Sequence, residues 1–152
     1  MIQDSATLQN RHNRFVRTVC KHEVVYSLEN EIGFASSSSI HFEDEEENPV
    51  GIICFWAEEA LAKSCMKNGW SDYKVVQVSL SEFIEDWCVG MENDRLLVGT
   101  EFDQNMFGYE SDPLELILEL VNELIQHKKE LHFKKFKGLL DVKDQVEKIL
   151  EE

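Results

Sequence analysis

The sequence predicts a single α+β domain in which a mainly antiparallel sheet of about five to six strands is flanked by helices and followed by a C-terminal helical extension. Two observations lead to this prediction. The chain has 152 residues, of which 43% are hydrophobic, enough for one core and too few for two comfortable domains. Short β-forming segments also alternate with amphipathic segments of helical period. We place an acidic α+β domain at residues 1–127 and a lysine-rich helical extension at residues 128–152.

A helix and a hairpin are expected first. Apolar side chains recur at near-helical spacing over residues 7–20, which predicts an amphipathic helix that packs through Phe15. The next segment, VVYSLENEIGFAS, has two short β-forming runs around Glu29 and Asn30 and therefore indicates a hairpin. We expect residues 36–39, four serines in a row, to form a polar loop or a sheet edge.

The densest charge in the chain lies between two further apolar runs, and together they predict a second hairpin. Expected strands at 40–42 and 50–56 flank five consecutive acids, Glu43–Glu47, which then lie at the loop tip. Pro49 has no backbone donor and fits the first position of a strand. Nearly continuous apolar residues over 51–56 indicate a central strand covered on both faces.

The middle of the chain alternates helix, strand and helix. Residues 57–69 are strong helix formers that begin with acids and end at a glycine. The segment YKVVQVS is typical of a strand, and Ser79 with Glu82 forms a capping box. The helix that this box begins should end at Gly90.

Two closing strands and the longest helix complete the predicted domain. RLLVGTEF and NMFGYE are expected to be strands separated by a loop around Asp103 and Gln104. Asp112 as N-cap and Pro113 at the first helical position begin the long helix. Its expected core stripe is Leu114, Ile117, Leu118, Val121, Leu124 and Ile125.

The lysine-rich extension ends in an amphipathic segment over residues 139–150. Three roles are open for it: docking on the domain, forming a homodimer through this helix, and covering a partner. Its lysines are well placed in sequence to lie against the acidic centre of the same molecule.

The charge of the chain favours a basic partner. Thirty acids face 15 Lys and Arg, and residues 21–112 alone hold 20 acidic and 5 basic residues, which is the whole net charge of −15. A field of this sign repels nucleic-acid phosphates and anionic membranes and attracts cationic proteins. We therefore expect a basic protein partner, no direct nucleic-acid binding and no membrane binding.

The location of the protein is expected to be cytoplasmic. The opening segment MIQDSATLQNRHNRF has no apolar stretch behind a basic start, and the longest strongly apolar run, 50–57, is far short of the roughly 20 residues that cross a bilayer. No CxxC pair occurs, and each cysteine lies in or beside an apolar segment, so we expect buried free thiols at Cys20, Cys54, Cys65 and Cys88.

The sequence contains no motif of catalysis. Neither a phosphate-binding glycine loop nor an HExxH or GxGxxG pattern occurs, and no histidine stands near a cysteine in zinc-finger spacing. We therefore expect no enzyme activity, no cofactor and no metal. One alternative stays open, a nucleophile made by Cys65 or Cys88 with His22 or His41, because such pairs meet in space and not in sequence.

Two groups of residues are candidate sites. The acidic loop is either a solvated turn that protects a hairpin edge or a dock for a cationic cleft, while calcium is disfavoured because the EF-hand pattern is absent. The candidate partner-binding acids are Glu43, Asp44, Glu45, Glu46, Glu47, Glu58, Glu59, Asp72, Glu92 and Asp94. An aromatic pocket is the second candidate, although a core role is favoured for its residues, Trp56, Trp70, Tyr73 and Trp87.

Spacing of aromatic and small residues in the middle of the chain is similar to that of a known family. The residues that carry the likeness are Trp56, Ala60, Cys65, Trp70, Tyr73, Leu80, Phe83 and Trp87, with ESDPLELILEL as a closing helix. Over roughly residues 15–124 the chain resembles the bacterial domain of unknown function 2750. This resemblance implies a small bacterial α+β domain and no reaction. The EDEEE loop and the lysine-rich extension depart from it.

The function expected from these observations is that of a non-enzymatic acidic binding protein. At the level of class, its size and charge resemble those of bacterial immunity or inhibitor proteins that neutralise a basic partner such as a toxin. A nucleic-acid mimic with an anti-defence role is an alternative, which competition with DNA or RNA for the same partner would reveal. Another is a small ligand-binding domain with a pocket near Trp70 and Tyr73.

Overall fold

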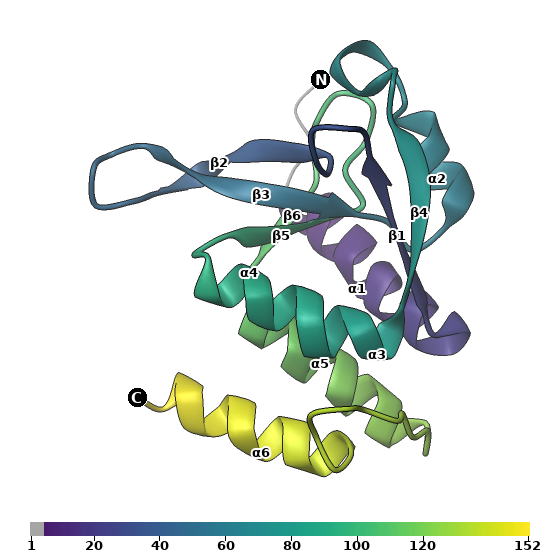
Figure 1. Cartoon of the computed structure of the whole chain (residues 1–152), viewed down its shortest axis with the longest axis vertical. Helices are drawn as coiled ribbons and strands as arrows, with labels where there is room; N and C mark the ends of the chain where they lie inside the picture. The colour runs from purple at the N-terminus through teal and green to yellow at the C-terminus, as the bar shows by residue number, and fades with distance from the viewer. Residues whose placement is uncertain (1–4) are drawn as a thin grey trace.

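The computed structural model describes residues 5–152 and confirms the predicted α+β class. Its six strands form two sheets, and most of the helices pack below them in the view of Figure 1. The smaller sheet pairs β1 (Val24–Glu29) with β4 (Lys74–Ser79). The larger sheet has the order β2-β3-β5-β6, made of β2 (Ser36–Glu43), β3 (Pro49–Phe55), β5 (Leu97–Thr100) and β6 (Tyr109–Ser111).

The helices occupy the two ends of the chain and the connections between strands. The first, α1, is followed by two short elements after β3, then by three consecutive segments that form one continuous helical stretch, and finally by two longer helices. Their bounds are α1 (Ser5–His22), α2 (Glu59–Ser64), the 3-10 turn η1 (Asn68–Trp70), α3 (Leu80–Glu82), the π-helical η2 (Phe83–Cys88), α4 (Val89–Asn93), α5 (Pro113–Gln126) and α6 (Leu139–Leu150). Across the described part of the chain, no helix is long and apolar enough to cross a membrane.

The pairing of strands is mainly antiparallel, as predicted, with one exception. β3 runs parallel to β5, with Ile52 opposite Leu97. The two sheets are joined where Tyr26 and Trp56 exchange backbone hydrogen bonds of 2.8 Å in both directions. This junction holds β1 against the end of β3, so that the two sheets share one body.

The first predicted hairpin is wrong in its pairing. β1 takes β4 as its partner, and the expected hairpin is reduced to one bridge, between Glu29 and Phe34. The turn itself forms because Asn30 Oδ1 accepts the backbone N–H of Ile32 at 2.9 Å. Beyond it the chain pairs with β3 from Ser36 onward, so of the two alternatives predicted for residues 36–39 the sheet edge is confirmed: they belong to β2, an edge strand.

The second predicted hairpin is confirmed. β2 and β3 pair antiparallel, and the acidic loop joins them at a tip that projects well away from the body of the molecule (Figure 1). The register shifts between Ser38 and Glu43. Within this irregular part Ser39 Oγ accepts the backbone N–H of Phe42 at 2.8 Å, which bends the strand.

Two predicted helix ends are wrong. The helix expected over 57–69 ends at Ser64 and is followed by a separate 3-10 turn. Cys65 then faces the opposite loop, where its thiol donates to the carbonyl of Phe102 at 3.2 Å. The later helix does begin at the predicted cap, Ser79, but it continues through Gly90 to Asn93, because helical structure tolerates an isolated glycine.

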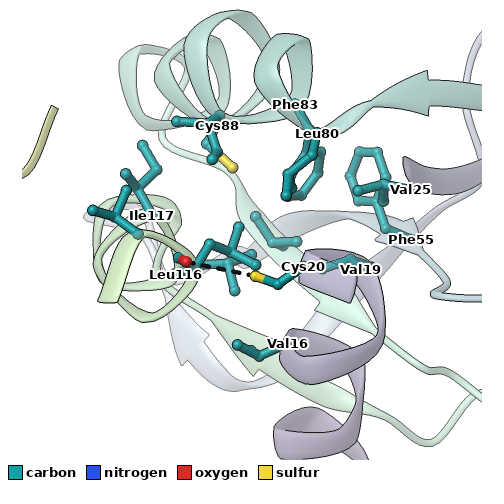
Figure 2. Close-up of a cluster of buried hydrophobic side chains, with 14 of the residues drawn as sticks. Val16, Val19, Cys20, Val25, Phe55, Leu80, Phe83, Cys88, Leu116 and Ile117 are labelled. Atoms are coloured by element: carbon teal, nitrogen blue, oxygen red, sulfur yellow. Dashed lines mark hydrogen bonds between the residues drawn. The ribbon is translucent and has the colours of Figure 1, made fainter. Parts of the chain in front are cut away.

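The main core lies between the helices and the sheets. Figure 2 shows Val16 and Val19 of α1, Phe83 of the central helical stretch and Leu116 of α5 converging on one cluster. Phe15 of α1 is fully buried, as predicted. A second, smaller cluster around Trp56 fills the space between β1, β3 and the loop after β5.

The buried face of α5 is wider than the predicted stripe. Leu116 and Leu120 are fully buried although they lie outside it, whereas Ile125 is 37% exposed. The reason is that α5 is covered from several sides, by α1, by the central helical stretch and by α6. A single-stripe pattern describes a helix with one covered face.

The C-terminal extension docks on the domain. Leu139, Val142 and Val146 of α6 are buried in the main core against α5. The lysine-rich segment before α6 is fixed by Lys135, whose Nζ lies 2.8 Å from Asp86 Oδ1. Its backbone N–H also donates to the buried carboxylate of Glu85. The lysines thus do lie against acids of the same molecule, while homodimerisation stays a prediction.

Candidate functional site

The acidic arm is the β2–β3 hairpin with its tip, Glu43–Glu47. All five tip residues are exposed. Asp44 has a structural role as well, because its Oδ1 accepts the backbone N–H of Glu46 at 2.9 Å and of Asn48 at 3.0 Å. Glu47 adopts a positive φ of 66°, which closes the turn. The turn therefore holds four glutamates outward on a defined loop.

Apolar side chains accompany these acids on the arm. Ile40 is 73% exposed and Phe42 is 53% exposed, and both belong to the edge strand β2. Large apolar side chains this exposed beside a charged tip are typical of contact surfaces. The segment SIHF was predicted only to be a strand, and its exposed apolar surface was missed. The sequence signal for this surface was the alternation of Ile40 and Phe42, which places both side chains on one face of a strand.

The acids near α2 are already paired within the chain. Glu58 Oε1 lies 2.6 Å from Arg14 Nη2, and Glu59 Oε1 lies 3.0 Å from Lys63 Nζ. In both pairs the nearby cation offsets the negative charge of the glutamate, so Glu58 and Glu59 attract a basic partner less strongly than unpaired acids do. Both lie after β3, at the end of that strand opposite to the acidic tip.

The remaining candidate acids come from two other parts of the fold. Asp72 Oδ2 accepts a 3.4 Å hydrogen bond from Asn30 and lies before β4. Glu92 and Asp94 lie at the end of α4. Burial and the nearby Asp112 raise the pKa of Glu92. The ten predicted acids thus belong to several separate elements, and the tip carries five of them on one loop.

The predicted aromatic pocket is only partly assembled. Trp56 and Trp70 meet edge to face with ring centroids 5.9 Å apart, and Tyr73 lies 6.5 Å from Trp70. Trp87 instead packs against the main core, where its ring centroid lies 5.5 Å from that of Phe55. Both Trp56 and Trp70 are buried, which agrees with the favoured core role.

A cleft that the sequence did not predict lies where the parallel strands β3 and β5 end side by side. We call it the Glu101 cleft, a hollow of about 200 Å³ lined by Arg11, Arg14, Trp56, Glu101 and Asp103 among others. Ligands of sheets with parallel strands bind preferentially beyond the carboxyl ends of those strands. A second hollow of about 210 Å³ shares Asp103 with it and reaches Cys65 and Trp70.

Glu101 is the most unusual side chain of this cleft. It is 7% exposed, and its backbone turns sharply with a φ of 54° directly after β5. One oxygen, Oε1, accepts the backbone N–H of Ala57 at 2.8 Å. Burial raises the pKa of Glu101 to about 7, and the negative Glu58 adds to this effect while the Ala57 N–H, Arg14 and Arg11 oppose it. A carboxyl group with this pKa exchanges protons near neutral pH.

Two arginines on one face of α1 form the opposite wall. Arg11 Nη1 lies 3.3 Å from Asp103 Oδ2, and Arg14 is paired with Glu58 as described above. Residues three apart on a helix point the same way. Two features of the sequence could have indicated this cleft. Arg11 and Arg14 lie on the polar face of the first helix, and Glu101 directly follows an apolar strand.

A buried polar network behind the cleft was also missed. His12 is fully buried, with Nδ1 2.8 Å from Thr100 Oγ1 and Nε2 2.9 Å from Glu119 Oε1. The ring of Tyr109 stacks on His12 at 4.1 Å. Because Thr100 is fully buried, a substrate has no direct access to its hydroxyl. The network connects α1, β5 and α5.

All four cysteines are buried and free, as predicted. Burial raises the pKa of each thiol, to about 12 for Cys20 and well above the ordinary value for Cys88. Neither Cys65 nor Cys88 forms a hydrogen bond with a histidine within the part of the chain that the structure describes. Nor does any group of three His, Cys, Asp or Glu in residues 5–152 have the arrangement of a metal site.

The fold and these surfaces define a small α+β domain with an acidic arm and a cleft beside a parallel strand pair. The family model described as Protein of unknown function (DUF2750) matches residues 12–120. The chain belongs to this family, as the aromatic spacing indicated. No curated protein and no solved structure matches the chain. The matched region ends within α5, so that the lysine-rich segment and α6 lie beyond it.

Proposed function

We propose that the protein is a non-enzymatic, cytoplasmic binding protein of the bacterial immunity or inhibitor type, which neutralises a basic protein partner such as a toxin. The acidic arm is the contact surface in this proposal. The observation that carries it is the combination, on one projecting hairpin, of the tip Glu43–Glu47 with the exposed side chains of Ile40 and Phe42.

The two kinds of side chain on the arm contribute differently to binding. The net charge of −15 and the concentrated acids of the tip attract a basic partner and speed its approach. Ile40 and Phe42 then lose solvent-exposed apolar surface in the complex, which slows dissociation. A projecting hairpin suits entry into a concave cationic surface such as an active-site cleft.

The experiment compares three immobilised chains in affinity capture from a lysate of the source cell. One is the native chain, and one has Glu43–Glu47 replaced by serine. The control carries the same change of five charges far from the arm, at Glu130, Asp144, Glu147, Glu151 and Glu152. A basic protein captured by the native chain and the control, but lost from the arm variant, is the expected result.

Binding constants for the captured protein then test the mechanism. We expect affinity to fall steeply as salt rises and the association rate to fall most in the arm variant. Ile40→Ser should instead raise the dissociation rate. Binding that is insensitive to salt and equal in all three chains would refute the proposal. Displacement of the captured partner by DNA or RNA would favour the nucleic-acid mimic.

A further inference from the structure

We propose that the Glu101 cleft binds a free α-amino acid, with the carboxylate of the ligand on Arg11 and Arg14 and its ammonium group on Glu101. This inference is independent of the acidic arm. It concerns a small molecule, a different surface and different residues, so either proposal can fail without the other.

The position of the cleft favours a ligand. β3 and β5 are parallel neighbours, with Phe55 opposite Thr100 at their last residues. The hollow of about 200 Å³ is lined by residues that directly follow both strands, Trp56 after β3 and Glu101 after β5. An amino acid with a small or medium side chain fits this size.

Arg11 and Arg14 are suited to a carboxylate. The hydrogen bonds described for them use one nitrogen of each guanidinium, with Asp103 and Glu58 as acceptors. A guanidinium has five N–H donors, so both retain free ones. The two acids hold the guanidinium groups in place, and the free N–H groups match the paired oxygens of a carboxylate.

Glu101 is suited to an ammonium group. Its Oε1 accepts the Ala57 N–H, and the other oxygen takes part in no hydrogen bond within the part of the chain that the structure describes. The carboxyl is buried, and an ionised carboxylate in such a place is stabilised by a cation beside it. An ammonium ligand supplies this charge and three donors.

The balance of charges selects a ligand with both groups. The groups facing Glu101 are the Ala57 N–H, the cations Arg11 and Arg14 and the anion Glu58, with Asp103 on the far side of Arg11. Two cations thus face three acids. A simple anion meets repulsion from the acids, and a simple cation meets repulsion from the arginines. A zwitterion pairs each of its charges and adds no net charge.

The test begins with thermal unfolding of the full chain at pH 7.5, with each of the twenty standard L-amino acids at 10 mM. Calorimetric titration follows for any that raises the melting temperature. The N-acetyl and amide forms of the best binder each lack one charge. We expect at least one amino acid to bind, and both of these analogues to bind at least tenfold more weakly.

Variants with matched controls locate the site. Glu101→Gln retains an oxygen for the Ala57 N–H and removes the charge, while Arg14→Gln changes an exposed residue with little risk to folding. Each should weaken binding at least tenfold. The controls are Glu59→Gln, whose partner is Lys63, and Arg17→Gln, which lies on α1 outside the cleft. Both should bind as the native chain does, and circular dichroism verifies that all four fold.

Three results would overturn the proposal. In the first, none of the twenty amino acids shifts the melting temperature. In the second, the N-acetyl form binds as tightly as the free amino acid, which would make the cleft a site for simple carboxylates. In the third, Arg14→Gln folds and binds with native affinity, which would place the ligand elsewhere.

Discussion

His12 and Thr100 are hydrogen-bonded in the protein interior at 2.8 Å, although 88 positions separate them in the sequence. On the other side of the ring, His12 Nε2 lies 2.9 Å from Oε1 of Glu119, a residue of α5. Because a carboxylate only accepts, Nε2 of the imidazole donates to Glu119. In a neutral ring Nδ1 then accepts the hydroxyl proton of Thr100. Three elements are thereby fixed to one another by a single side chain.

The first prediction concerns Thr100→Val, which has nearly the same shape and lacks the hydroxyl. His12 would lose a partner in a fully buried place, and we expect the free energy of unfolding to fall by about 1–3 kcal/mol. Thr18→Val, a partly exposed position on α1, is the control and should change it by less than about 0.5 kcal/mol. Urea unfolding measures both. Equal effects would mean that the hydrogen bond contributes little.

The second prediction is a pH dependence of stability that originates at Glu101. Its pKa is about 7 in the folded chain against an ordinary value of 4.5, so the folded state binds the proton more tightly. The contribution to stability is full below about pH 4.5 and is lost as pH rises through 7. Between pH 5 and 8 the loss should be about 2.5 kcal/mol.

Glu101→Gln isolates this effect, since glutamine does not titrate. Urea unfolding at several pH values should show that the native chain loses more stability than the variant as pH rises. Parallel curves for the two chains would contradict the prediction and place the carboxyl in a more hydrated setting.

Local signals of the sequence predicted the outlines of this fold well. The cap at Ser79, the N-cap at Asp112 and the hairpin around the acidic tip are all confirmed. Each depends on residues within a few positions of one another, where hydrogen bonding and steric limits act directly. Pairing between β1 and β4, in contrast, joins segments about 50 residues apart, and no local pattern encodes that choice.

The candidate sites show the same division. The acidic tip is a contiguous run and was visible in the sequence. The Glu101 cleft needs Arg11 from α1, Trp56 from the end of β3 and Glu101 from the end of β5. Its existence depends on the parallel pairing of β3 with β5, and no local pattern in the sequence indicated that these two strands are neighbours. Ion pairs such as Arg14 with Glu58 were hidden for the same reason.

The third prediction concerns thiol chemistry. Burial raises the pKa of Cys20 to about 12 and shifts the other three thiols in the same direction, so little thiolate exists at neutral pH. We expect Ellman's reagent to react slowly with the native chain at pH 8 and with all four cysteines after unfolding in guanidinium. Fast reaction of one thiol in the native chain would reveal an accessible site, with Cys65 beside the second hollow the first to examine.

The fourth prediction tests whether α6 belongs to the core. Val142 is fully buried, whereas Leu140 on the same helix is 67% exposed. Val142→Ala should lower the free energy of unfolding by about 2 kcal/mol, because it removes buried apolar groups and leaves a cavity. Leu140→Ala removes more atoms and should cost less than about 0.5 kcal/mol. A larger effect at Leu140 would mean that its exposed side chain is covered by another chain, and sedimentation equilibrium would then reveal the homodimer.

The fifth prediction concerns the loop that forms one wall of the cleft. The ring of Phe102 packs against Gly99 and Gly108, and a Cβ at Gly99 would lie 2.7 Å from its Cε1 and 2.8 Å from Ile52 Cγ2. Phe102 also accepts the Trp56 indole N–H at its carbonyl, 2.9 Å away, so it cannot move aside freely. Gly99→Ala should therefore cost about 1–3 kcal/mol of stability through overpacking. Gly33→Ala, where a Cβ meets open space, is the control. Because Phe102 follows Glu101 directly, Gly99→Ala should also displace the carboxyl, and its effect on amino-acid binding should exceed that of Gly33→Ala at equal folded fraction.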